Sequence, residues 1–137
     1  MVEDIYKKYP DDVKVVIKNF PLSSHKQAMK AALYALAAGK QGNYYEMYKK
    51  ILDNYGKLRN NEDLPIQYAI ELGLDVDLLK RDMADPAFEE LIKEEISQLR
   101  NTGMRLAVPK FLINGKEPKG RTVDAWSASI DEILVKK

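Results

Sequence analysis

The segment from Gly103 to Gly115 is the feature that most constrains how this chain can fold. Before it the sequence is mostly helical in its periodicity, and after it there is room for one hairpin and one helix. Pro109 is tolerated at the first residue of an apolar strand, because its missing N–H need not enter the ladder. The dipeptide Asn114-Gly115 is a strong hairpin signal. The segment therefore predicts a strand over 110–114 that ends in a tight turn.

Two other short runs complete the predicted β structure. The run from Val13 to Phe20 is rich in β-branched residues, alternates partially and is bounded by Pro21. It predicts a strand that is buried on at least one face. The segment from Lys119 to Arg121 is expected to pair with 110–114 across the turn.

Apolar residues recur at helical spacing through the rest of the chain. The stretch from His25 to about Gly39 is rich in alanine, which is typical of a helix that packs closely against another element. The predicted helices cover about 3–9, 25–39, 44–55, 64–72, 75–83, 86–103 and 122–134. The last of them turns four apolar side chains inward, namely Trp126, Ile130, Ile133 and Leu134. This order of helices and strands predicts an α/β fold built on a small sheet.

The composition is that of one ordinary globular domain, with 137 residues of which 45% are hydrophobic and 31% charged. The 22 basic and 21 acidic side chains nearly cancel, so no global field attracts nucleic acid. No apolar run approaches the roughly 20 residues that cross a bilayer. We therefore expect neither a nucleic-acid nor a membrane partner.

The chain contains no cysteine and a single histidine, His25. Disulfides, thiolate metal sites and thiol chemistry by this chain alone are therefore excluded, as is a multi-histidine metal site. His25 can be an acid or base, but we favour a structural residue that bonds or caps at a helix start. The acidic pairs Asp75/Asp77 and Asp82/Asp85 lack converging ligands. We expect no catalytic residue, metal or cofactor.

Two clusters have both a functional and a structural interpretation. Four tyrosines can form an aromatic ligand groove, but their helical spacing favours packing with hydroxyls at the surface: Tyr44, Tyr45, Tyr48 and Tyr55. Four basic residues near the turn can contact an anion, but Glu117 lies among them and favours a solvated loop: Lys110, Lys116, Lys119 and Arg121.

Several short motifs follow one another in a specific order along the chain. They are residues 15–22 followed by His25 and the alanine-rich helix, then Gln41-Gly42, Gly73-Leu74-Asp75, Val108-Pro109 and Ile113-Asn114-Gly115. Together they resemble the DsbA-like family of the thioredoxin fold, over roughly residues 5 to 134. The resemblance implies one domain over 1–137, with a small thioredoxin-like sheet and a helical insertion over about 24–103.

Members of that family are typically exported thiol–disulfide oxidoreductases. Their chemistry resides in a strand followed by Cys-x-x-Cys at the start of the first helix, where the helix dipole lowers the pKa of the nucleophile. Residues 3–9 of this chain correspond to the end of that helix. We therefore expect an N-terminally truncated fold that lacks the central strand and the cysteine pair. Such a chain is redox-inactive by itself, because no other side chain replaces a thiolate.

Val108 and Pro109 match the family's X-cis-Pro site. There the residue before proline offers its backbone to an extended substrate, so the resemblance implies that Val108 and Pro109 bind substrate and that their bond is cis. By base rates alone, Pro109 would simply begin a strand in the trans form.

The missing strand would leave two apolar edges bare, at 13–20 and at 110–114, and bare edges seek partners. Another chain can supply strands, the two remaining strands can close up, or the helices can shift inward. We expect a homodimer through these edges, because the strong run at 13–20 has no obvious second neighbour.

Three functional hypotheses follow from this resemblance. The first is a DsbA-like protein without redox activity, and the second is a non-catalytic peptide-binding or assembly module that uses the groove at Val108-Pro109. The third is a relative of the kappa-class glutathione transferases. The family is typically exported, but Met1-Val2-Glu3-Asp4 lacks the features of a signal peptide, so the compartment stays open.

Overall fold

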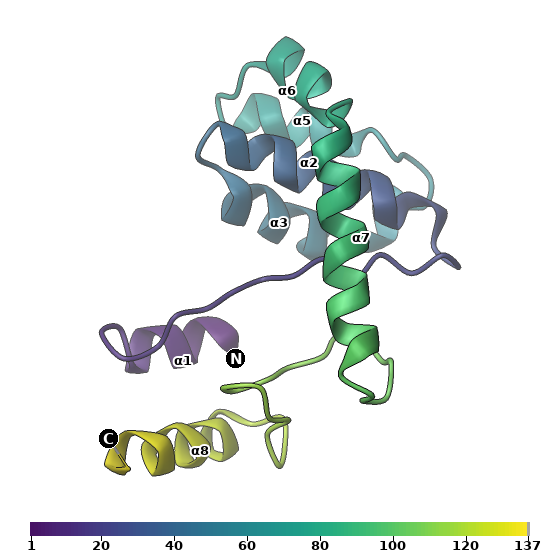
Figure 1. Ribbon diagram of the computed structural model, residues 1–137. Helices are drawn as coiled ribbons and strands as arrows, with labels where there is room; N and C mark the ends of the chain where they lie inside the picture. The colour runs from purple at the N-terminus through teal and green to yellow at the C-terminus, as the bar shows by residue number, and fades with distance from the viewer. Residues whose placement is uncertain (137) are drawn as a thin grey trace. The chain divides into compact units, whose positions relative to one another are not determined.

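The computed structural model describes residues 1–136, which form two compact units (Figure 1). The first, here called the helical unit, is Lys18–Met104. The second, the terminal unit, consists of Met1–Ile17 and the segment that begins at Arg105.

The helical unit contains six helices, which pack around a core of large apolar side chains. The helices are α2 (Lys26–Lys40), α3 (Tyr44–Asp53), α4 (Tyr55–Leu58), α5 (Leu64–Glu71), α6 (Val76–Met83) and α7 (Pro86–Asn101). Helix α2 packs against α3 and α6, because its alanines allow close approach. The deepest side chains of this core are Tyr34, Met47, Leu58, Leu79 and Ile92.

Local signals in the sequence explain where these helices begin and end. The Asp75 carboxylate accepts a hydrogen bond from the N–H of Leu78 at 2.9 Å, which caps α6. The Asp85 carboxylate caps α7 in the same way by accepting from the N–H of Ala87 at 3.0 Å. Pro86 occupies the first turn of α7, where its missing N–H costs nothing.

The terminal unit contains α1 (Val2–Lys8) and α8 (Val123–Val135). Its core joins Ile5 and Tyr9 to Trp126 and Ile130. The Tyr9 hydroxyl donates to the Asp131 carboxylate at 2.7 Å, which holds the end of α1 against α8. Among the four side chains predicted to turn inward on this last helix, Trp126 and Ile130 are buried and Leu134 packs against them.

All seven predicted helices are confirmed, with ends that differ by a few residues. The short helix α4 was not predicted as a separate helix, because apolar spacing continues through Tyr55. Asn54 interrupts the helix there: its backbone leaves the helical region at φ −125°, and its side-chain amide donates to the Lys50 carbonyl at 3.0 Å.

The predicted α/β fold is wrong for the described residues 1–136. No sheet forms there, and the predicted thioredoxin-like strands at 13–20 and 110–114 do not pair with each other. The one β bridge in this part of the chain joins Ile113 to Lys116, so the predicted partner segment at 119–121 does not pair either. The expectation of a small sheet with a missing central strand is corrected accordingly.

The physical reason is that β propensity needs a neighbouring backbone to become a strand. The N–H of Val13 donates instead to the Tyr9 carbonyl at 3.1 Å, and the N–H of Asn19 donates to the Glu95 carboxylate at 2.7 Å. Val16 is 64% exposed, so the run is not buried as its composition predicted. The run is extended in shape but has no ladder.

No helix within residues 1–136 combines the length and the apolar character that crossing a membrane requires.

Candidate functional site

The predicted site residues Val108 and Pro109 lie in the extended part of the terminal unit that precedes the hairpin. The peptide bond between them is cis, which is the isomer that the resemblance implied. Both side chains are exposed, with Val108 at 37%. The two residues are therefore accessible from solvent in this unit.

Residues that follow Pro109 anchor this segment to the core of the terminal unit. The rings of Phe111 and Trp126 lie 4.8 Å apart between centroids at an angle of 55°, and Ile113 packs against the same core. The Trp126 indole N–H donates to the Gly120 carbonyl at 2.8 Å. This packing holds both arms of the hairpin on α8.

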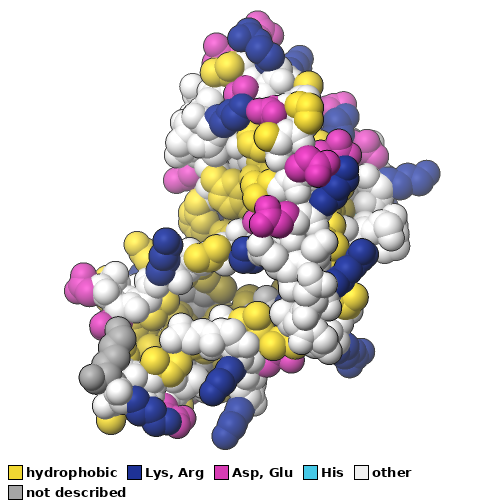
Figure 2. All heavy atoms as spheres, in the orientation of Figure 1, with side chains coloured by type: hydrophobic (Ala, Val, Ile, Leu, Met, Phe, Trp, Pro, Cys, Tyr) yellow, Lys and Arg dark blue, Asp and Glu magenta, His cyan; other side chains and the backbone are white. Residues whose placement is uncertain are grey.

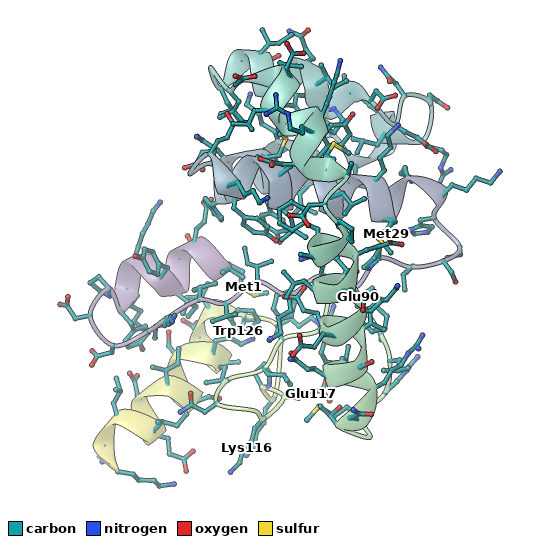
Figure 3. All side chains as sticks on the ribbon, turned by 45° about the horizontal axis from the view of Figure 1, so that its top comes forward. Met1, Met29, Glu90, Lys116, Glu117 and Trp126 are labelled. Atoms are coloured by element: carbon teal, nitrogen blue, oxygen red, sulfur yellow. The ribbon has the colours of Figure 1, made fainter. Side chains whose placement is uncertain are left out.

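The hairpin itself closes as the sequence predicted. Asn114 has φ +46° and Gly115 has φ +81°, which are the left-handed values that a two-residue turn of this type requires. The N–H of Ile113 donates to the Lys116 carbonyl at 2.8 Å, and the N–H of Lys116 donates back at 3.1 Å. Figure 3 shows Lys116 extending outward from the turn.

Arg121 reaches back from the second arm to the candidate site. Its guanidinium donates to the Pro109 carbonyl at 3.2 Å and lies 5.8 Å from the centroid of the Phe111 ring. The two contacts fix a cation next to the cis bond. The sequence analysis placed Arg121 in a basic cluster, but nothing in the sequence indicates its bond to a carbonyl twelve residues earlier.

The side of the segment that faces solvent is apolar. Leu106 is 50% exposed and Leu112 is 40% exposed, whereas Phe111 and Ile113 turn to the core. From Phe111 to Ile113, side chains therefore alternate between the core and solvent, as in a strand. Figure 2 shows hydrophobic side chains interspersed with basic and acidic ones on the visible face of the molecule.

The backbone of this segment is largely unpaired. Within the described chain, the N–H groups of four residues donate to no protein acceptor, namely Val108, Lys110, Phe111 and Leu112. A second segment has the same property within residues 1–136. The N–H groups of its four residues donate to no protein acceptor, namely Lys14, Val15, Val16 and Ile17. Each segment therefore offers main-chain groups that water or another backbone can take.

Charges around the hairpin are partly neutralised. The Lys110 ammonium pairs with the Glu117 carboxylate at 2.6 Å. The Glu132 carboxyl has a lowered pKa because Lys136 bonds to it, with smaller contributions from Lys119 and Lys116. Lys116 and Lys119 of the predicted basic cluster thus lie in an exposed loop, whereas the Lys110 side chain is only 10% exposed. Arg121 is the cation that contacts the Pro109 carbonyl.

The other candidates from the sequence lie in the helical unit. His25 precedes α2 at the capping position, is exposed, and makes no capping bond through its side chain. Tyr44 and Tyr48 stack at 6.1 Å and pack against the core, as predicted. The Tyr44 hydroxyl is buried, so the predicted position of this hydroxyl at the surface is wrong, and burial raises the pKa of Tyr44 to about 12. Tyr45 and Tyr55 instead stay exposed, at 42% and 74%.

The acidic pairs do not gather. Asp75 and Asp85 each cap a helix, and Asp82 pairs with Lys40 at 3.3 Å. Across residues 1–136, no three histidine, aspartate or glutamate side chains converge as metal ligands.

Comparison with known proteins gives a family and a set of longer relatives. Residues 1–132 match the sequence profile of a family described as thioredoxin. The Na(+)/H(+) antiporter NhaA 1 of Salinispora arenicola is 31% identical over 121 residues, which cover 87% of this chain and 18% of the antiporter. The Na(+)/H(+) antiporter NhaA of Herminiimonas arsenicoxydans is 30% identical over 127 residues, which cover 90% of this chain and 20% of that protein.

The chain therefore spans about a fifth of the length of the curated relatives it matches. No solved structure matches it.

Proposed function

Because this chain belongs to the thioredoxin family, whose profile matches residues 1–132, we propose that it is a DsbA-like, non-catalytic binding module. Its exposed segment at Val108 and Pro109 pairs with an extended polypeptide. The observation that carries this proposal is the row of unpaired backbone N–H groups beside exposed apolar side chains. An added strand satisfies such a row, since its own main chain supplies matching acceptors.

The absence of cysteine from the sequence supports a role in binding rather than in redox catalysis. Disulfide exchange proceeds through a thiolate that attacks a disulfide sulfur, and no other side chain performs this step. The thiol–disulfide exchange implied by the DsbA-like resemblance is therefore not proposed for this chain by itself.

An insulin-reduction assay with dithiothreitol tests the redox part of the proposal. We expect the rate of insulin precipitation to equal that of the buffer control at every protein concentration. A rate that increases with the amount of chain would contradict the proposal, whatever the outcome of binding experiments.

A peptide-binding experiment tests the pairing itself. A fluorescent peptide of alternating valine and threonine is titrated with the full chain, and a matched peptide carries N-methyl groups along both of its edges. We expect the unmodified peptide to raise the anisotropy and the N-methylated peptide to bind at least about tenfold more weakly, because the methyl groups keep its carbonyl acceptors away from the N–H groups of the chain. Equal binding of the two peptides would show that backbone pairing is not involved.

Variants locate the pairing on the chain. Val108→Asn removes an exposed apolar contact at the site, and Pro109→Ala changes the site residue next to it. Val135→Asn is the matched control, because Val135 is 87% exposed at the end of α8. We expect weaker peptide binding in the first two variants and unchanged binding in the control.

The longer relatives support a modular role. A segment similar to this chain makes up about a fifth of proteins named Na(+)/H(+) antiporters. Ion transport belongs to those proteins by name, and we propose for this chain only the binding role that a small shared segment can carry.

A further inference from the structure

The charge of the chain is unevenly distributed along the sequence. The whole chain has a formal net charge of +1, yet residues 105–121 hold five basic side chains and one acidic side chain. The basic ones are Arg105, Lys110, Lys116, Lys119 and Arg121, and the acidic one is Glu117. The segment proposed to pair with a peptide therefore lies within a stretch of net positive charge.

Not all of these cations are available to a ligand. Lys110 is paired with Glu117 at 2.6 Å, and Glu132 lies near enough to Lys116 and Lys119 for both to lower its pKa. Arg121 has no carboxylate partner within residues 1–136, and it contacts the Pro109 carbonyl and the Phe111 ring. Arg105, Lys116 and Lys119 make no direct ion pair in that part of the chain either. Arg121 differs from them in that it contacts the site itself.

The position of Arg121 is also fixed before any ligand arrives. A guanidinium presents five N–H donors in a planar fork, and the contact with Pro109 uses one of its two terminal nitrogens. The ring of Phe111 supports its face at 5.8 Å. The remaining donors can receive a carboxylate with two parallel hydrogen bonds, at little further cost in side-chain entropy.

We infer that the polypeptide strand that pairs at Val108 and Pro109 carries an aspartate or glutamate side chain, which Arg121 receives. This inference rests on the proposed function and adds the chemistry of the partner. The apolar residues of the strand lie against the exposed face of Leu106, Val108 and Leu112. The partner is thus an extended peptide with apolar residues on one face and an acidic residue within reach of Arg121.

Three peptides in one alternating valine–threonine frame test the inference, with aspartate, asparagine or lysine at the central position. Affinity for the full chain is measured by fluorescence anisotropy at low and at high sodium chloride. We expect the aspartate peptide to bind about fivefold more tightly than the asparagine peptide and the lysine peptide to bind most weakly. High salt should reduce these differences, because the ion pair is exposed to solvent.

The outcomes separate the two proposals. If all three peptides bind equally, the inference is wrong while the proposed pairing stands. If none binds, the proposed function is wrong and the inference falls with it. Inorganic phosphate, compared with sodium chloride at equal ionic strength, should not displace the aspartate peptide; full displacement would show a simple anion site instead.

Variants assign the preference to one side chain. Arg121→Gln should abolish the preference for aspartate over asparagine, and Arg121→Lys should retain part of it, because the charge remains but the planar fork is lost. Lys7→Gln is the matched control, since it removes one exposed cation from α1 of the same unit. Circular dichroism verifies the fold of each variant, and a preference that survives Arg121→Gln would overturn the assignment.

Discussion

At the scale of single residues, two buried tyrosines of the helical unit differ in how their hydroxyls affect the stability of the fold. Tyr34 is 2% exposed, and its hydroxyl donates to the Asp63 carboxylate at 2.6 Å. Burial, followed by this bond, raises the pKa of Tyr34 above its usual range. Tyr68 is 6% exposed, but no described residue hydrogen-bonds to its hydroxyl. A buried polar group without a partner costs free energy.

Replacing each tyrosine by phenylalanine should therefore have opposite effects. Tyr34→Phe should lower the free energy of unfolding by about 1 kcal/mol, because it removes a hydrogen bond to a charged acceptor. Tyr68→Phe should leave that free energy unchanged or raise it by up to about 1 kcal/mol. Urea denaturation followed by circular dichroism measures both. An equal loss in the two variants would mean that the Tyr68 hydroxyl has a bonding partner in solution.

The carboxylate partner of Tyr34 also predicts a dependence on pH. The bond from Lys30, at 2.7 Å, and then the bond from Tyr34 hold the pKa of Asp63 below its ordinary value of 3.8. A pKa lowered in the folded state stabilises the protein above the ordinary value, and this stabilisation is lost as the pH falls through the folded pKa. We expect Asp63→Asn to lose less stability than the wild type as the pH falls from about 5 to about 2, measured by urea denaturation. A parallel acid profile in both proteins would contradict this prediction.

At the scale of elements, the hairpin turn requires a glycine whereas the short helix α4 does not. Gly115 has φ +81° in the hairpin, a value at which a residue with a side chain is strained. The strain would come from the backbone alone, because no atom lies within 4 Å of the position that a Cβ would occupy. Gly56 lies in the short helix α4, with open space around it and no such constraint. The same substitution thus probes a required glycine and a dispensable one.

Gly115→Ala should destabilise the chain by about 1 kcal/mol, because alanine is strained in the left-handed region. Gly56→Ala should instead stabilise it by about 0.5 kcal/mol, since alanine loses less backbone entropy in a helix. Thermal unfolding of the two variants provides the comparison. If Gly115→Ala unfolds like the wild type, the turn does not keep this geometry in solution.

At the scale of the whole molecule, the chain consists of two units that each have a core. The core of the helical unit gathers around Tyr34, Met47 and Leu79, and the core of the terminal unit around Tyr9 and Trp126. The extended segments at 14–17 and 105–112 belong to neither core in full and have few backbone hydrogen bonds. Such segments are the usual sites of proteolytic cleavage.

Limited trypsin digestion should therefore cut first in segments 14–18 and 105–121, where the lysines and arginines lie outside the helices. The fragment that persists should contain α2 through α7, because a helical backbone must unfold before it enters a protease. Mass spectrometry identifies the products with time. Early cuts within α2 or α7 would contradict this order.

The unpaired segments also bear on association between copies of the chain. We propose, as the sequence led us to expect, that a second copy can pair through the runs at 13–20 and 110–114. In the first run, the N–H groups of residues 14–17 donate to no protein acceptor in the described chain. Light scattering should show a dimer that dissociates on dilution, and Val16→Pro should weaken it, because proline removes a backbone donor. A compact monomer at every concentration would exclude the homodimer and leave the peptide-binding proposal untouched.

The sequence by itself determined the helices and the hairpin turn, because the signals for both act over a few neighbouring residues. These signals are the apolar spacing, the caps Asp75 and Asp85 at helix starts, and Asn114-Gly115 in the turn. It also determined that no thiol chemistry belongs to this chain. Only the tertiary structure decided that the runs at 13–20 and 110–114 form no sheet, and that Arg121 bonds to Pro109. Pairing of strands and contacts across twelve residues depend on which backbone and side-chain atoms meet in space, and local propensity does not encode that meeting.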